Sequence, residues 1–84
     1  MKYRAKSVDS PRRYVTYTYG VYSGKPLEDE TMKGLAQSIA YLYHRHAVQL
    51  YESEDGKHFI KADEDAQSKF SHIMSDEFTL DEWH

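Results

Sequence analysis

The sequence predicts one small α+β domain with the element order (β)βαββα, in which two helices pack on one face of a three- or four-stranded sheet. Residues 12–23 are rich in β-branched and aromatic residues, as strands are. Residues 28–46 and 64–77 carry apolar residues at helical spacing, and a hairpin-like segment lies between them. Because 84 residues suffice for one core and not for two, we expect residues 1–84 to form a single domain.

The N-terminal part of the chain is expected to supply the first strand or strands. Within residues 12–23, every second side chain is expected to point toward the core. Residues 2–8 also alternate, so residues 1–13 are expected to form either a basic N-terminal arm or an edge strand. The side chains expected to face the core are Val15, Tyr17, Tyr19 and Val21.

The first helix is expected over about residues 28–46. The acidic residues 28–30 would occupy its first turn, where the helix dipole favours negative charge. Gly34 inside the helix is expected to mark a close approach to the sheet. The apolar stripe of this helix comprises Met32, Leu35, Ala36, Ile39, Leu42, Tyr43 and His46.

Residues 48–62 predict a hairpin around Asp55-Gly56, for which two registers compete. A two-residue loop would pair Leu50 with Lys61. A three-residue loop of residues 54–56, with Gly56 in the left-handed conformation, would pair Leu50 with Ile60. We favour the second register because it separates apolar from polar side chains. The apolar face would then consist of Val48, Leu50, Ile60 and Ala62.

The second helix is expected to follow an N-cap at Asp63 and to run over about residues 64–77. Residues 79–82 match a capping box, so a separate final turn is expected to carry Trp83 back onto the domain. The apolar stripe of this helix comprises Ala66, Phe70, Ile73, Met74 and Phe78.

The composition argues against several classes of protein. The chain has no cysteine, which excludes disulfides and thiolate metal sites, and no apolar run long enough to span a membrane. No nucleophile elbow, phosphate loop or paired catalytic motif occurs. We therefore expect a soluble, cytoplasmic protein that is not an enzyme and carries no cofactor.

The histidines form no recognised metal motif. His44 and His46 would point to different sides of a helix, because they are two residues apart. They would share a metal ion only if the helix ended at Tyr43, with His58 or His72 completing the set. We expect no metal site.

Several short motifs occur in this sequence in an order that is also found in a known protein family. Pro26-Leu27 stands before the first helix, Ala62-Asp63 precedes the second, and an acidic pair and a Trp follow at residues 81–83. In these features, and in the stripe of Phe70, Ile73, Met74 and Phe78, residues 14–83 resemble the DinI family of small bacterial and phage-encoded proteins.

The DinI resemblance implies both a fold and a function. It implies the order β-α-β-β-α and a role in the SOS response as a modulator of the RecA recombinase. The acidic last helix of that family imitates the phosphates of single-stranded DNA and binds the recombinase at or near its DNA groove. The chain departs from the family in its basic residues 1–13 and its many tyrosines.

The charge pattern points to the same end of the chain. Residues 1–25 hold six Lys or Arg and one Asp, whereas residues 62–84 hold seven carboxylates and one Lys. A helix can place carboxylates at phosphate-like intervals, which a basic nucleic-acid groove would attract. A phage-type DNA mimic that inhibits a host defence or nuclease complex is the alternative. Capping and hydration alone also explain residues 63–65. The expected partner-binding residues are Asp63, Glu64, Asp65, Asp76, Glu77, Asp81, Glu82 and Trp83.

The basic front of the chain supports a different hypothesis, direct nucleic-acid binding through cations and stacking rings. The same cations would equally suit the acidic helix of this chain or of a neighbouring copy. The Tyr-rich strand also predicts a partner surface or a homodimer, because tyrosine is enriched at interfaces. The residues expected to bind nucleic acid are Lys2, Arg4, Lys6, Arg12, Arg13 and Tyr14.

Overall fold

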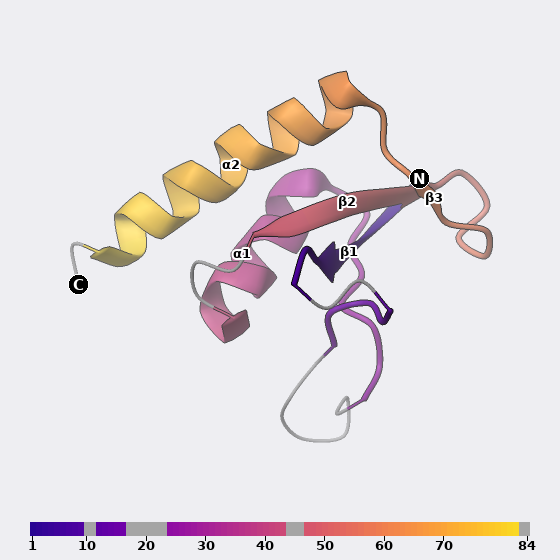
Figure 1. Cartoon of the computed structure of the whole chain (residues 1–84), viewed down its shortest axis with the longest axis horizontal. Helices are drawn as coiled ribbons and strands as arrows, with labels where there is room; N and C mark the ends of the chain where they lie inside the picture. Colours follow the sequence, from indigo (N-terminus) through magenta and orange to yellow (C-terminus); the bar gives the residue numbers. More distant parts are fainter. Residues whose placement is uncertain (10–11, 17–23, 44–46, 83–84) are drawn as a thin grey trace.

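The computed structural model describes residues 1–9, 12–16, 24–43 and 47–82, without the side chains of residues 41–43 and 77–82. These residues form an α+β domain of order βαββα with one three-stranded antiparallel sheet, as predicted (Figure 1). The central strand of the sheet is β2, which pairs with β1 on one side and with β3 on the other. The elements are β1 (Lys2–Ser7), α1 (Met32–Tyr43), β2 (Val48–Ser53), β3 (Ile60–Lys61) and α2 (Glu64–Glu82).

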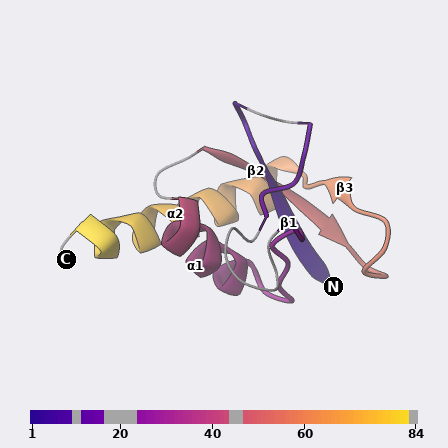
Figure 2. The same ribbon diagram turned by 90° about the horizontal axis from the view of Figure 1, so that it is seen from below.

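One core joins both helices to one face of the sheet. Helices α1 and α2 lie against each other on one side of the sheet (Figure 2). Their apolar side chains form one core with those of β1 and β2. From the sheet, Ala5 and Leu50 are directly paired and fully buried. Most of the predicted stripe positions that the structure describes are buried, so the periodicity identified the core faces of both helices. The largest fully buried side chains are Phe70, Leu27, Leu35, Ile39 and Leu50.

The first strand is formed by Lys2–Ser7, so the prediction of an edge strand there was correct. The prediction of a long strand over residues 12–23 was wrong for its described part, in which Tyr14 and Thr16 make only isolated bridges. The reason is that the outer edge of β1 is shared. Tyr3 exchanges backbone hydrogen bonds with Asp29, and within residues 12–16 the Val15 amide donates to the Ala5 carbonyl. Val15 is buried as predicted, whereas Tyr17, Tyr19 and Val21 lie outside the described residues.

Helix α1 begins later than predicted, at Met32. Thr31 is its N-cap, because the Thr31 Oγ1 accepts a hydrogen bond of 3.0 Å from the Gly34 amide. The Asp29 carboxylate in turn accepts bonds from the amide and hydroxyl of Thr31, so residues 28–30 precede the helix and position its cap. A Cβ atom at Gly34 would overlap the Asp29 carboxylate, so the nearest approach at this glycine is to that side chain.

The hairpin adopts neither predicted register. Tyr51 lies opposite Lys61 and Glu52 lies opposite Ile60, so a longer loop joins β2 to β3. The observed register differs from the favoured one by two residues, which keeps every side chain on its predicted face. Val48, Leu50 and Ala62 are therefore buried as predicted, but Ile60, opposite Glu52, is 66% exposed.

Helix α2 is longer than predicted and runs unbroken to Glu82. The prediction of a separate final turn over residues 79–82 was wrong, because no Gly or Pro interrupts the segment and the helix simply continues. Asp63 is the N-cap as predicted, with its Oδ1 accepting a bond of 2.8 Å from the Ala66 amide. Neither described helix has the run of apolar residues that would let it cross a membrane.

A side chain of α2 completes the hydrogen bonding of the central strand. The Gln67 Oε1 accepts a bond of 2.7 Å from the Leu50 amide, and the Gln67 Nε2 donates to the Val48 carbonyl at 3.2 Å. Strand β3 is only two residues long and does not reach these groups. Gln67 thus takes the place of a strand partner and ties α2 to β2.

Candidate functional site

The sheet face opposite the helices carries a transverse row of polar and aromatic side chains. Arg4 lies directly opposite Tyr51, and Tyr51 lies directly opposite Lys61, so one residue from each strand forms the row. Lys2 and Lys6 share this face with Arg4, because alternate residues of a strand point the same way. We call this side of the sheet the open face.

Three aromatic rings gather on the open face around two cations. The Tyr14 ring makes edge contacts with Tyr51, at 5.6 Å between centroids, and with Phe59, at 6.0 Å. The Arg4 guanidinium lies 4.1 Å from the centroid of Phe59, and the Lys6 ammonium lies 4.7 Å from Tyr51 and 4.9 Å from Tyr14. Such cation–π contacts hold rings and cations together at modest cost in hydration. We call these five residues the cation–ring cluster.

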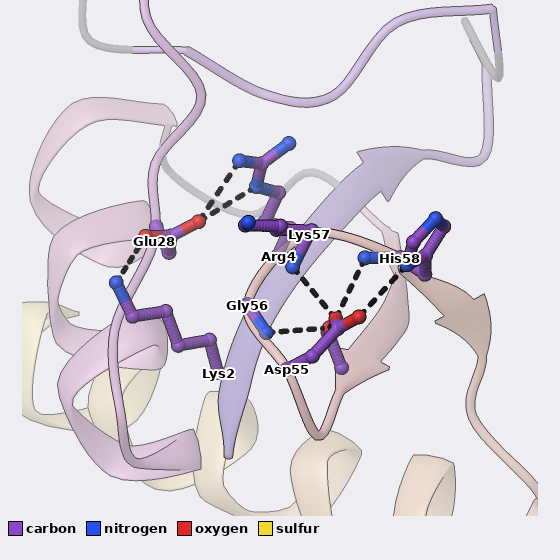
Figure 3. Close-up of polar contacts among 8 residues, drawn as sticks. Lys2, Arg4, Glu28, Asp55, Gly56, Lys57 and His58 are labelled. Atoms are coloured by element: carbon purple, nitrogen blue, oxygen red, sulfur yellow. Dashed lines mark hydrogen bonds and ion pairs between the residues drawn. The ribbon is translucent and has the colours of Figure 1, made fainter.

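Two cations of β1 are neutralised within the chain. Glu28, just before α1, pairs with Lys2 at 3.1 Å and with Arg4 at 2.9 Å (Figure 3). Partial burial raises the pKa of Glu28, but the hydrogen bonds from Lys2 and Arg4 together lower it by more, so its pKa lies below the ordinary value. Lys6 differs from both, because among the described residues it contacts rings and no carboxylate.

The structure brings together part of the predicted nucleic-acid set. Lys6 and Tyr14 contact each other on the open face, and Lys2 and Arg4 lie beside them. Arg12 and Arg13 are exposed on the segment that leads to Tyr14. Tyr51 and Phe59 were not predicted as site residues, because no local pattern indicates that β1 pairs with β2 and brings this face of the hairpin to the basic strand.

The acidic residues of α2 occupy its two ends. Asp63 caps the helix, and Glu64 and Asp65 follow in the first turn, all three exposed. Asp76 is exposed eleven residues beyond Asp65, a distance of about 16 Å along a helix axis. Three further predicted residues, Glu77, Asp81 and Glu82, belong to α2 but have side chains outside the description, and Trp83 lies outside the described residues.

The two charged surfaces lie on different sides of the domain. Within the described residues, no carboxylate of α2 takes part in an ion pair, whereas the cations of β1 pair with Glu28 or contact rings. The hypothesis that the basic front neutralises the acidic helix of the same chain therefore fails for these residues. The negative electrostatic field of the α2 carboxylates can therefore act on ions in solvent or on a basic partner.

The Asp55 carboxylate holds the loop between β2 and β3 in place through several hydrogen bonds. The Asp55 Oδ1 accepts bonds of 2.8 and 2.9 Å from the amides of Lys57 and His58, and the Ser53 hydroxyl donates to it at 2.8 Å (Figure 3). The Asp55 Oδ2 lies 2.8 Å from the His58 Nδ1. Gly56 in this loop has a φ of 77°, as predicted, which favours glycine.

The Asp55–His58 pair shifts both pKa values in opposite directions. The hydrogen bond with His58 and the two backbone amides lower the pKa of Asp55 well below its usual range. The same bond, with the negative charge of Asp55, raises the pKa of His58. An open cavity of about 420 Å³ adjoins the loop. Asp55 accepts four bonds in all, three of them from residues of this loop, so the carboxylate fixes the loop conformation.

The other histidines form no ligand set in the part of the chain that the structure describes. His58 is held by Asp55 and His72 is exposed on α2, whereas His44 and His46 lie outside the description. Over the described ranges, no three His, Cys, Asp or Glu residues converge as metal ligands would.

Comparison with known proteins adds no relative. No family model, curated protein or solved structure matches this chain. The function therefore has to be inferred from the two charged surfaces and from the element order.

Proposed function

We propose that this chain is a non-enzymatic binding protein whose acidic helix α2 engages the basic DNA-binding groove of a DNA-handling protein. The observation that carries the proposal is the separation of charge. The described α2 carboxylates are exposed and without ion pairs, and the cations of β1 lie on the opposite side of the sheet. A protein surface built for phosphates would attract such a helix.

The shape of α2 supports this function. Its 19 residues form a rod of about 28 Å, and one side of it is anchored by Phe70 and Met74. Because the helix continues to Glu82, the acidic residues near its end share one rigid element with those at its start. The end carries four carboxylate residues in seven positions and is the stronger candidate, since Asp63 also serves as the cap.

The element order supports a RecA-like recombinase as the specific target. The resemblance to the DinI family implied the order β-α-β-β-α, and the described residues have that order. The match differs in one detail. The first strand is Lys2–Ser7, which lies within the basic residues 1–13 and outside residues 14–83 that carry the resemblance, so only the order from α1 to α2 falls inside the resembling range.

A competition experiment tests the proposal. Labelled single-stranded DNA bound to a purified RecA-like recombinase should be displaced by this chain at low salt and less well at high salt. The variant Asp76→Lys/Glu77→Lys should weaken displacement by about tenfold or more, because two attractions become repulsions. The control Glu30→Lys/Glu54→Lys makes the same change in net charge at two exposed positions away from α2.

The outcomes separate the candidates. Equal loss in both variants would show that only net charge matters and would refute recognition through α2. If the recombinase does not bind, but a pull-down from lysate retains a nuclease or defence complex that Asp76→Lys/Glu77→Lys releases, the DNA-mimic inhibitor replaces the recombinase modulator. If no partner is found whose binding is weakened by Asp76→Lys/Glu77→Lys, both candidate functions are wrong.

A further inference from the structure

The open face holds cations that no carboxylate of the described residues neutralises, and Lys6 is the one that lies among the aromatic rings. Lys6 lies between the rings of Tyr14 and Tyr51, and among the described residues no carboxylate reaches it. Arg4 in the same cluster is neutralised by Glu28 at 2.9 Å. An ammonium group whose described contacts are rings leaves its hydrogen-bond donors available to a ligand. An anionic group placed there would complete its coordination.

Further positive charge surrounds this cation. Lys61 lies in the same transverse row as Tyr51 and is exposed. Arg12 and Arg13 are exposed next to Tyr14 along the chain. The row spans three strands, a width of about 10 Å. The face therefore offers a narrow cationic strip, although the whole chain has a net charge of −3.

The rings determine what kind of anion fits this strip. Tyr14, Tyr51 and Phe59 are half-buried, so each presents part of its surface to solvent. The Tyr14 ring meets Tyr51 and Phe59 at interplanar angles of 88° and 62°, and the Arg4 guanidinium lies over the Phe59 ring. Aromatic rings and guanidinium planes are the surfaces on which unpaired bases stack. A duplex hides the faces of its bases and would use only the charges.

We propose that the open face binds single-stranded nucleic acid, with Lys6 contacting a phosphate and the cation–ring cluster stacking bases. This site is separate from α2 and does not depend on the function proposed for that helix. The acidic helix of a second copy would also satisfy Lys6, but its carboxylates would leave the rings without a stacking partner. Nucleic acid uses both features of the cluster.

Fluorescence anisotropy with the full chain and a labelled oligothymidylate of about 20 nucleotides tests this site. We expect binding at low salt, about 50 mM, that weakens as salt rises. Lys6→Gln should weaken binding severalfold and lower the slope of the salt dependence by about one, the signature of one lost phosphate contact. Lys33→Gln, at an exposed position on α1, is the matched control and should leave both unchanged.

A second pair of variants tests the stacking. Tyr51→Ala should weaken binding roughly tenfold, whereas Tyr51→Phe keeps the ring and should retain most of the affinity. Far-UV circular dichroism establishes that each variant is folded. If Tyr51→Ala does not fold, Tyr51→Leu takes its place with the same expected loss.

Four results would overturn the proposal. They are absence of binding at low salt, equal affinity for duplex of the same sequence, and equal effects of Lys6→Gln and Lys33→Gln. The fourth is self-association in sedimentation that Lys6→Gln abolishes while oligothymidylate is not bound, which would assign the face to a second copy of the chain.

Discussion

Replacing Gln67 tests how α2 is attached to the sheet. The side-chain amide of Gln67 accepts a hydrogen bond from the Leu50 backbone N–H and donates one to the Val48 carbonyl, both on the central strand. Gln67→Ala leaves both of these backbone groups without their partner, and the two-residue strand β3 does not extend far enough to replace it. A buried backbone group without a partner costs about 1–3 kcal/mol, so the two together predict a loss of about 2–6 kcal/mol.

That loss is large for a domain of this size. Domains have about 0.05–0.15 kcal/mol of stability per residue, or about 4–13 kcal/mol for 84 residues. Urea denaturation followed by far-UV circular dichroism measures the difference in the free energy of unfolding. Hydrogen exchange at the Leu50 amide should accelerate in the variant, because its acceptor is gone.

Two further variants make the test specific. Gln37→Ala makes the same substitution at an exposed position of α1 and should change stability by less than about 0.5 kcal/mol. Gln67→Glu keeps the acceptor for the Leu50 amide but sets a carboxylate oxygen against the Val48 carbonyl, so it should keep the slow exchange of the Leu50 amide that Gln67→Ala loses. If Gln67→Ala is as stable as Gln37→Ala, or if Leu50 exchanges at the same rate, the role assigned to this side chain is wrong.

Three other predictions follow from the described contacts. Gly34→Ala should fail to stabilise the chain, because the new Cβ overlaps the Asp29 carboxylate. In an Asp29→Ala background the same substitution should raise the free energy of unfolding, measured by urea denaturation, by up to about 1 kcal/mol. Additive effects of the two substitutions would contradict this prediction. The pKa of His58, followed by NMR, should lie above its ordinary value of 6.5 and return toward it in Asp55→Asn. The pairing of Asp55 with His58 should stabilise the loop fully between about pH 4 and 6.5. This stabilisation should weaken as the pH rises through the pKa of folded His58 or falls through the pKa of folded Asp55. Amide exchange in the loop that does not change with pH would refute this prediction. Phe70→Ala should cost about 3–5 kcal/mol by thermal denaturation, since Phe70 is fully buried, and a loss under 1 kcal/mol would exclude its place in the core.

The core faces could be predicted because they depend on periodicity alone. Leu35 and Ile39 on α1 and Phe70 and Met74 on α2 recur at helical spacing, and all four are buried. The hairpin shows the limit of this rule. Leu50 and Ala62 were placed on the correct face although the register was wrong by two residues, because a shift of two preserves the alternation.

The starts and partners of elements were harder to predict because they depend on competition between distant segments. Residues 12–16 have high strand propensity, yet Asp29 takes part of the edge of β1 that they would need. Glu28 looked like a residue of the first helical turn, but it pairs with Lys2 and Arg4 on another element. Neither competitor is visible to a local pattern.

By itself, the sequence determined the α+β class, the order of the elements, the buried faces and the opposite charges at the two ends of the chain, since each of these is set by composition and local spacing. Only the tertiary structure decided which side chains share a surface. The antiparallel pairing of β1 with β2 brings Lys6 to Tyr51, and a bridge brings Tyr14 to both. Those contacts join segments far apart in the chain, and their formation depends on the free energy of the whole fold.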